Sequence, residues 1–278
     1  MIIKVIIINN NTYNLILICL NMEKIDVEAV KEKKIINKVM TGSYDINKWL
    51  EGGYENDIIT LFYGPSASGK SNFVILAACH NAKKGKKIIF VDTEGSFSLD
   101  RVKQITGGLP EIALKNILIL KPTSFQEQKQ AFFKLLKELK ETKGIGLVIV
   151  DSMTMLYRLE LADARKIGIE EVKKVNNDLV KQIKTLYEIA RKKEIPVLIT
   201  SQVYSDFLSE EDWMAGKEAG VNVVGGDILK YWSKCIIELQ NKHGKKKAII
   251  RKHRSLPETE LNFEVVDEGI RKSFRIFG

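Results

Sequence analysis

A glycine-framed loop between an apolar run and a helical pattern constrains the fold of this chain more than any other feature. The run Asp57–Tyr63 (DIITLFY) leads into the string G-P-S-A-S-G-K-S, which has the form G-x-x-x-x-G-K-[ST]. Glycines at both ends allow the backbone to wrap around a phosphate group, towards which the loop amides and the start of the next helix then point. The string therefore predicts a nucleotide site, with Lys70 on the β- and γ-phosphates and Ser71 on Mg²⁺. Its eight residues are Gly64, Pro65, Ser66, Ala67, Ser68, Gly69, Lys70 and Ser71, called the phosphate loop below.

Short apolar runs alternate with helical patterns along most of the chain. Two of the intervening segments, 125–139 and 172–190, carry apolar residues at three- and four-residue steps. Apolar runs without alternation are typical of strands buried on both faces, and the 3.6-residue period is typical of helices that cover them. The pattern predicts an α/β fold with a mostly parallel sheet and helices on both of its faces. The further apolar runs are Lys87–Asp92, Asn116–Leu120, Leu147–Asp151 and Pro196–Thr200.

The pattern changes after residue 226. The segments 235–240 (CIIELQ) and 247–253 (KAIIRKH) predict an antiparallel hairpin with Gly244 in its turn, and 261–267 (LNFEVVD) predicts a further strand. With 45% hydrophobic and 28% charged residues, the composition is that of a globular protein and argues against disorder. We find no repeat and no Pro-rich linker, so residues 42–278 are predicted to form one domain.

The chain before that domain changes character at Met22. Residues 1–21 are apolar at both ends of a polar stretch, and each apolar run is shorter than the roughly 20 residues that a membrane span needs. We interpret them either as a misassigned start, with translation beginning at Met22, or as a disordered extension. Residues 22–41 are rich in charge and predict a short helical leader. The three cysteines form no C-x-x-C pair, which favours a reducing compartment such as the cytoplasm.

Three polar residues follow the ends of predicted strands, where ligands bind in open α/β sheets. Asp151 ends the run LVIVD, and its carboxylate can hold Mg²⁺ through the water shell of the ion. Glu94 follows the run IIFVD and can orient and deprotonate a water molecule near the γ-phosphate. Gln202 follows the run PVLIT, and its amide can detect the γ-phosphate through a hydrogen bond. We predict that Glu94 and Gln202 are catalytic and that Ser71 and Asp151 serve the metal.

These motifs resemble those of the RecA/RadA recombinase family. D-T-E-G-S-F (92–97) is similar to the family's D-T-E-G-T-F, and I-T-S-Q-V (199–203) is similar to its I-T-N-Q-V. The stretches 40–53 and 223–234 resemble the family's entry segment and its later G-G-x-x-x-x-x-x-S segment, so the resemblance covers residues 40–278. It implies a RecA-like ATPase core that uses ATP and Mg²⁺ in homologous recombination and DNA repair. It also implies that Arg101 stacks on the adenine ring of the nucleotide.

Two features make the chain resemble one branch of this family in particular. The segment before Gly42 is short, as in archaeal paralogs of RadA that lack the family's N-terminal DNA-binding domain, and KHRSLPE (252–258) resembles their K-H-R stretch. The resemblance implies an accessory or regulator of a RadA-type recombinase, with weak, DNA-dependent ATPase activity. It is also compatible with a homo-oligomer.

A basic run lies in the predicted hairpin of a chain whose net charge is +9. One interpretation is a solvated hairpin tip, and another is contact with DNA phosphates, which we apply to Lys245–Lys247. A third applies to Lys252 and Arg254, which would share one face of a strand. They would touch the γ-phosphate of a neighbouring subunit, similar to the K-x-R pair of KaiC-type hexameric ATPases. The basic residues are Lys242, Lys245, Lys246, Lys247, Arg251, Lys252 and Arg254.

The two segments that hold single-stranded DNA in recombinases are not strongly basic here. The segment after Gln202 contains five acidic residues and one lysine, although Phe207 and Trp213 offer stacking surfaces for bases. The segment after Tyr157, expected to be a loop, mixes both charges. We therefore expect moderate to weak binding of single-stranded DNA. Two alternatives stay open: a KaiC-like ring-forming signalling ATPase that does not use DNA, and a non-enzymatic module that binds ATP and a partner protein.

Overall fold

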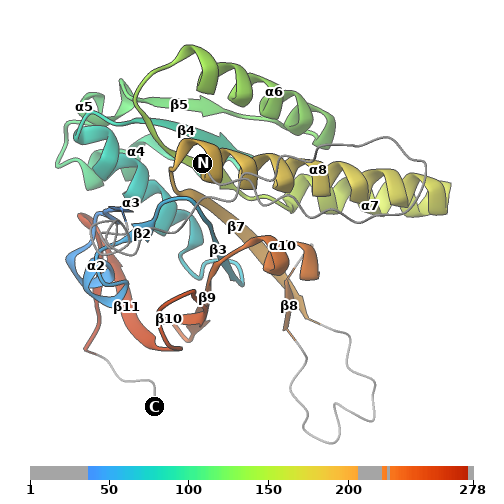
Figure 1. The fold of residues 1–278 in the computed structure, drawn as a ribbon. Coiled ribbons are helices and arrows are strands. Elements are labelled where there is room, and N and C mark those ends of the chain that lie inside the picture. Colours follow the sequence, from blue (N-terminus) through green and yellow to red (C-terminus); the bar gives the residue numbers. More distant parts are fainter. Residues whose placement is uncertain (1–36, 206–220, 224–225, 275–278) are drawn as a thin grey trace, which may run out of the picture. The chain divides into compact units, whose positions relative to one another are not determined.

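The computed structural model describes residues 37–205, 221–223 and 226–274. A large mixed sheet carries helices on both faces (Figure 1). Its strand order is β12-β11-β10-β9-β3-β7-β6-β4-β5, and β8 (Val221–Val223) pairs with β7. The predicted α/β fold is confirmed. The predictions for residues 1–21, for most of the leader and for the acidic segment 206–220 fall outside the described residues.

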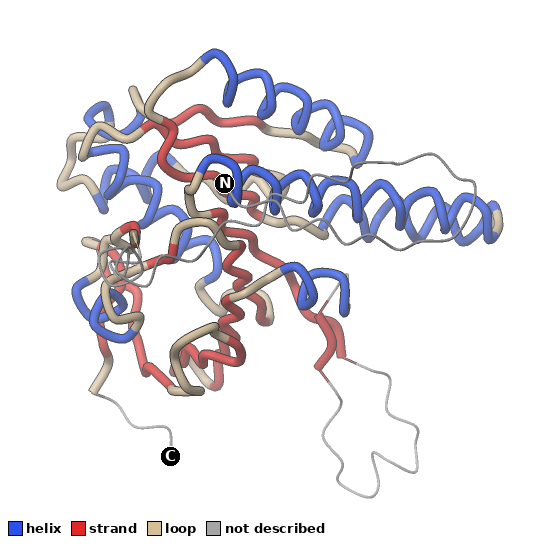
Figure 2. Tube along the Cα trace, in the orientation of Figure 1, coloured by secondary structure: helices blue, strands red, loops and turns tan. Residues whose placement is uncertain are grey.

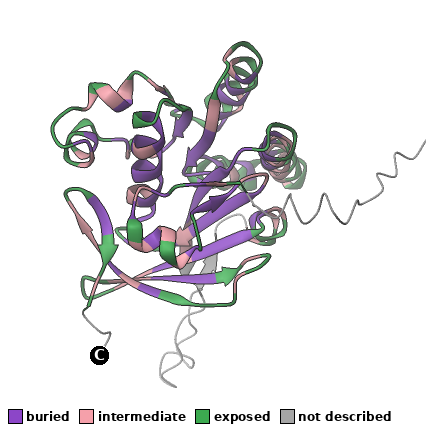
Figure 3. Cartoon of the chain, turned by 60° about the vertical axis from the view of Figure 1, so that its left-hand side comes forward, coloured by how far each residue is buried: buried purple, intermediate pink, exposed green. Residues whose placement is uncertain are grey.

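Five parallel strands correspond to the five apolar runs of the sequence. Their side chains alternate between two apolar clusters, because Phe62 and Phe90 pack into one cluster whereas Leu61 and Ile89 pack into the other. Burial on both faces explains why these strands show no polar alternation, and the strands are largely purple in Figure 3. The strands are β3 (Ile59–Gly64), β4 (Lys87–Asp92), β5 (Ile117–Leu120), β6 (Ile145–Asp151) and β7 (Val197–Ser205).

The helices divide between the same two clusters, so that the strands lie between two sets of helices (Figure 2). The first cluster takes residues from α2 (Tyr44–Trp49), α3 (Lys70–Lys83), α4 (Leu99–Ile105) and α5 (Glu111–Leu114). The second takes residues from α6 (Phe125–Glu141), α7 (Met155–Ile167), α8 (Ile169–Lys193) and α10 (Gly226–Trp232).

The start of α6 shows how local sequence sets the boundary of an element. The Ser124 hydroxyl accepts a hydrogen bond from the Glu127 amide at 3.1 Å. The Glu127 carboxylate in turn accepts bonds from the amide and hydroxyl of Thr123, both at 2.8 Å. These bonds from Thr123 hold the pKa of Glu127 below its usual value. This reciprocal capping fixes the first turn, so that Phe125 and Phe132 face the second cluster.

Two local predictions are wrong. The segment after Tyr157, expected to be a loop, lies in the helix α7. The chain turns at Gly168 after the end of this helix, and α7 packs against α8 (Figure 1). Within the predicted helical leader, Lys38 and Val39 form the strand β1 instead. They do so because they pair antiparallel with β2 (Tyr54–Glu55), a tertiary contact that outweighs the local helical pattern.

The predicted C-terminal hairpin is confirmed. Strands β9 (Cys235–Lys242) and β10 (Lys245–Lys252) pair antiparallel, and β11 (Glu260–Val266) follows. A short edge strand, β12 (Gly269–Lys272), was not predicted. Strand β9 runs parallel to β3, which brings the hairpin beside the strand that leads into the phosphate loop. Among the described residues, no helix is long and apolar enough to cross a membrane.

Candidate nucleotide-binding site

The phosphate loop joins the end of β3 to the start of α3. Gly69 caps the helix with a φ of +108°, a conformation that favours glycine. A Cβ at Gly64 would lie 2.1 Å from the main-chain oxygen of Leu239 on β9. The first turn of α3 contains no acidic residue, so its free amides and positive dipole end remain suited to an anion.

Lys70 is buried at the base of this loop. Its side-chain Nζ donates hydrogen bonds to the main-chain oxygens of Gly64 at 2.9 Å and Pro65 at 2.8 Å. Burial lowers the pKa of Lys70, while the nearby carboxylates of Glu94 and Asp151 act in the opposite direction. The ammonium is thus removed from water and faces carbonyl oxygens, a setting in which a bound phosphate would add charge-assisted bonds.

Asp151 lies at the end of β6, opposite Asp92 at the end of β4. It is 1% exposed, and its carboxylate accepts hydrogen bonds from the hydroxyls of Thr200, at 2.5 Å, and Ser96. Asp92 shapes the loop that follows β4, because its carboxylate accepts bonds from the amides of Ser96 and Phe97 at 3.0 and 3.2 Å. These hydroxyl and amide donors keep the buried carboxylates satisfied.

Glu94 and Gln202 meet directly. The Gln202 amide nitrogen lies 3.3 Å from both carboxylate oxygens of Glu94. Gln202 is also the partner of Gly64 in the β3–β7 register, so it lies beside the first residue of the phosphate loop. Four of the predicted residues, Lys70, Asp151, Glu94 and Gln202, therefore come together at the carboxyl ends of neighbouring strands. The sequence predicts each of them but not the contact between Glu94 and Gln202.

The Arg101 side chain makes hydrogen bonds within the chain that the resemblance does not imply. Its guanidinium donates to the main-chain oxygens of Val266 at 2.9 Å, Asp267 at 3.3 Å and Gly269 at 3.0 Å. Burial lowers its pKa. The side chain thus ties α4 to the turn between β11 and β12, and stacking on adenine stays a prediction.

Lys252 and Arg254 do not form the predicted pair on one strand face, because β10 ends at Lys252. Lys252 donates to the main-chain oxygen of Lys230 at 3.0 Å. Arg254 lies 2.5 Å from Glu55 and 3.0 Å from Asp57. Glu55 is 1% exposed, so this guanidinium neutralises a buried carboxylate of its own chain. The two residues therefore have partners within the chain, and their contact with the γ-phosphate of a neighbouring subunit stays a prediction.

Most of the other residues of the basic run also have partners within the chain. Lys246 donates to the main-chain oxygen of Ala67 at 2.8 Å, and Lys247 pairs with Glu260 at 2.8 Å. Arg251 contacts two carboxylates, those of Glu238 and Glu258, both at 2.6 Å. These three residues therefore have partners within the chain, and contact between Lys245–Lys247 and DNA stays a prediction. The stacking candidates Phe207 and Trp213 lie outside the described residues.

Comparison with known proteins shows the family of this chain. A family model described as Rad51 matches residues 31–273. A protein of Methanococcus maripaludis named DNA repair and recombination protein RadB is 38% identical over 226 residues, 81% of this chain and 96% of that protein. A protein of the same name from Methanobrevibacter smithii is 38% identical over 239 residues, 84% of this chain and 95% of that protein.

The solved structures give the same result. A chain titled "Crystal structure of the RadB recombinase" has a TM-score of 0.66 and 32% sequence identity, and the match covers 84% of this chain and 99% of that chain. The resemblance to the short archaeal paralogs of RadA is thereby confirmed. The fold implies use of a nucleotide and Mg²⁺. From the family model and from these relatives, the chain belongs to the Rad51 family.

Proposed function

We propose that this protein binds ATP with Mg²⁺ at the phosphate loop and uses the nucleotide to control its work in DNA recombination and repair. One observation carries the proposal. Neighbouring strand ends bring buried Lys70, buried Asp151 and the Glu94–Gln202 pair to one edge of the sheet. This is the edge where open α/β sheets bind ligands. The names of the relatives, DNA repair and recombination protein RadB, support the cellular role.

The residues present fit a nucleotide with its metal. Lys70 and the start of α3 would hold the β- and γ-phosphates, and Ser71 and Asp151 would hold Mg²⁺. The Ser68 hydroxyl, buried in the loop, has no hydrogen-bond partner in the described part of the chain. A bound Mg²⁺ supplies positive charge that offsets the charge of the phosphate oxygens. Glu94 would orient and deprotonate the attacking water, and Gln202 would hold Glu94 until the γ-phosphate competes for the amide.

The strength of DNA binding depends on how many basic side chains can contact the DNA phosphates. Because most of the described basic run is paired within the chain, we infer moderate to weak binding of single-stranded DNA and slow, DNA-dependent turnover. A protein of this kind would assist or regulate a RadA-type recombinase and could form a homo-oligomer. The KaiC-like alternative is not favoured, because the matching family model is Rad51 and the relatives are named DNA repair and recombination protein RadB.

The test is ATP hydrolysis with and without single-stranded DNA, run beside Lys70→Ala. We expect DNA to stimulate hydrolysis and the variant to abolish it. Glu94→Gln should keep ATP binding and lose roughly 10²-fold or more in turnover, since it removes the base. Turnover that ignores DNA at low salt would contradict DNA coupling. Equal turnover by the wild type and Glu94→Gln would instead favour a module that binds ATP without using it.

A further inference from the structure

The hairpin β9–β10 holds the outer side of the phosphate loop. The main-chain oxygen of Ala67 accepts a hydrogen bond from Lys246 Nζ at 2.8 Å and another from Asn241 Nδ2 at 3.3 Å. Asn241 and Lys246 are direct cross-strand partners on β9 and β10. Two side chains more than 170 residues along the chain therefore converge on one carbonyl of the loop.

That carbonyl belongs to a residue with an uncommon backbone. Ala67 has a φ of +58°, which is uncommon for a residue other than glycine. In a planar trans peptide the C=O of Ala67 and the N–H of Ser68 point in opposite directions. A carbonyl held against the hairpin therefore turns the Ser68 amide towards the interior of the loop, where it donates a hydrogen bond to the main-chain oxygen of Pro65 at 3.3 Å, an acceptor that a phosphate oxygen would replace. The hairpin contact thus orients an amide that phosphate oxygens would use.

Lys246 also brings charge. Burial lowers its pKa, and the partner of its ammonium in the structure is a carbonyl oxygen, whereas its neighbour Lys247 has the carboxylate of Glu260. A partly desolvated ammonium bonded to a carbonyl is stabilised further when negative charge arrives nearby. The phosphates of a nucleotide at the loop would supply that charge.

We propose that Lys246 is a positioning residue of the nucleotide site. With Asn241 it holds the Ala67 carbonyl on the hairpin side of the loop, so that the Ser68 amide faces the phosphates, and it sets a second ammonium beside the loop in addition to Lys70. This inference rests on the proposed binding of ATP at the phosphate loop. It assigns to the nucleotide site a lysine that the sequence alone assigns to DNA or solvent.

The test is nucleotide affinity, measured by titrating the full-length protein with a fluorescent ATP analogue in the presence of Mg²⁺. Lys246→Met should weaken binding by roughly ten-fold, the value of one charge-assisted hydrogen bond. Lys246→Arg should restore most of the affinity, because a guanidinium can also donate to the carbonyl. Asn241→Ala should weaken binding less, since it removes a longer, neutral bond. Lys272→Met removes the same charge from the exposed edge strand β12 and should leave affinity within about two-fold.

The outcomes separate this inference from the proposed function. If the wild type fails to bind the analogue, or if Lys70→Ala binds as the wild type does, the proposed function fails and this inference fails with it. If Lys70→Ala loses binding but Lys246→Met binds as the wild type does, the inference alone is overturned. Equal losses in Lys246→Met and Lys272→Met would also overturn it, because they would indicate an effect of net charge. Melting temperatures without nucleotide should be similar for the wild type and Lys246→Arg. If Lys246→Arg does not restore the nucleotide affinity that Lys246→Met loses, the positioning role is contradicted.

Discussion

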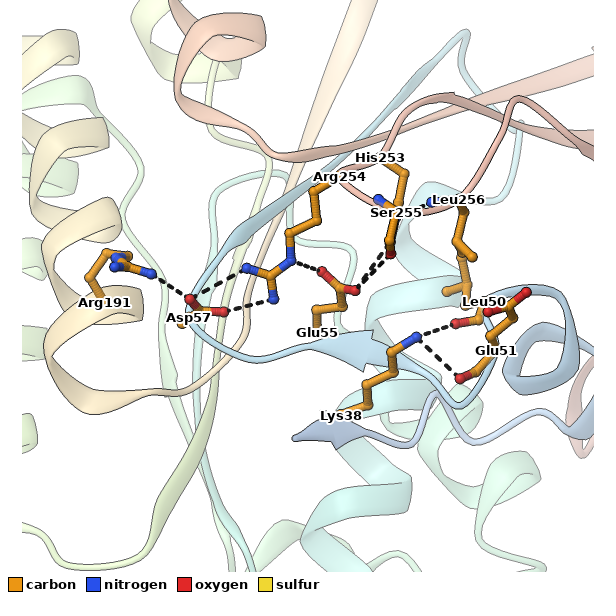
Figure 4. Close-up of polar contacts among 10 residues, drawn as sticks. All are labelled: Lys38, Leu50, Glu51, Glu55, Asp57, Arg191, His253, Arg254, Ser255 and Leu256. Carbon is orange, nitrogen blue, oxygen red and sulfur yellow. Dashed lines mark hydrogen bonds and ion pairs between the residues drawn. The ribbon is translucent and has the colours of Figure 1, made fainter. Parts of the chain in front are cut away.

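Arg254 shows how burial decides what a charged residue does. Its side chain is 35% exposed, while the side chain of its partner Glu55 is 1% exposed. Asp57 joins the pair from the segment after β2 and also contacts Arg191 at the end of α8 (Figure 4). The group therefore connects three segments distant in sequence, and its function is to keep a buried carboxylate neutralised.

Replacing Arg254 should therefore destabilise the fold. In Arg254→Met the Glu55 carboxylate stays buried without its closest cation, and we expect a loss of about 2 kcal/mol or more in the free energy of unfolding. The control is Arg271→Met, which removes an arginine from the exposed Glu264 pair and should cost under about 1 kcal/mol. Urea denaturation of both variants measures the difference. Equal losses in the free energy of unfolding would show that the buried pair of Arg254 and Glu55 contributes no more to stability than the exposed pair does.

The turn that follows β10 adds a dependence on pH. His253 Nδ1 accepts hydrogen bonds from the amides of Ser255 at 3.1 Å and Leu256 at 3.0 Å, so this nitrogen carries no proton in the folded state. Burial lowers the pKa of His253; Glu55 opposes this shift, and Lys38 and Arg254 reinforce it. Protonation would break both amide bonds of the turn.

Stability should consequently fall as the pH falls below the ordinary histidine pKa of about 6.5. In that range the unfolded chain binds a proton that the folded His253 still refuses, and the loss continues down to the lowered pKa of the folded state. His253→Asn should flatten the part of the pH profile that depends on this group. Denaturation midpoints between about pH 5 and 8 test this. Parallel profiles for the wild type and His253→Asn would refute the assignment.

At the scale of elements, the phosphate loop is shaped by its neighbours as much as by its own sequence. Its first glycine lies against the Leu239 carbonyl, and Gly69 lies against the ring of Phe263 on β11. Packing between strands therefore requires glycine at position 64, whereas the positive φ of +108° favours glycine at position 69.

Gly64→Ala should be much more disruptive than alanine at an open glycine. Its Cβ would be 2.1 Å from a backbone oxygen that cannot turn away, and we expect a loss of roughly 3 kcal/mol or more with loss of nucleotide binding. Gly85→Ala is the control, because Gly85 has a φ of +83° but nothing within 4 Å of its added Cβ. That variant should cost about 1–2 kcal/mol. Comparable melting temperatures for the two variants would argue against the packing account.

The sequence predicts what is local and misses what depends on distant partners. The five parallel strands and the phosphate loop follow from contiguous residues, and all are found in the structure. The contacts that Arg254 makes within the chain are missed because its partner Asp57 lies 197 residues away in the sequence. The helix α7 is missed although its buried residues Leu156, Tyr157 and Ala164 share one helical face, because the resemblance to the DNA-binding loops of recombinases implies a loop in this segment.

For the whole molecule, the net positive charge does not equal the number of basic side chains that lack a partner within the chain. The chain carries +9, yet Lys246, Lys247, Arg251, Lys252 and Arg254 are engaged within it. On α7 and α8, Lys166, Lys173 and Lys174 each pair with an acidic residue three positions earlier. DNA phosphates would therefore have to compete with these intrachain partners for the same cations.

The salt dependence of DNA binding tests this. On single strands, each contacted phosphate contributes a slope of about −0.7 to the plot of log affinity against log salt concentration. Lys252→Met should leave that slope unchanged, because its ammonium is bonded to the Lys230 carbonyl. Fluorescence anisotropy with labelled single-stranded DNA measures the slope. A reduction of roughly 0.7 would instead place Lys252 on the DNA.

The position of β3 has a consequence for synthesis of the chain. This strand carries the phosphate loop, yet its neighbours in the sheet are β7 and β9, which the ribosome makes more than 100 residues later. Until β7 joins, Glu94 lacks Gln202, and until β9 joins, the flank of Gly64 is bare. A nascent chain therefore cannot assemble the nucleotide site early, and such long-range pairing is slow. Nucleotide binding then becomes a signal of completed folding, so truncated or stalled chains would remain unliganded.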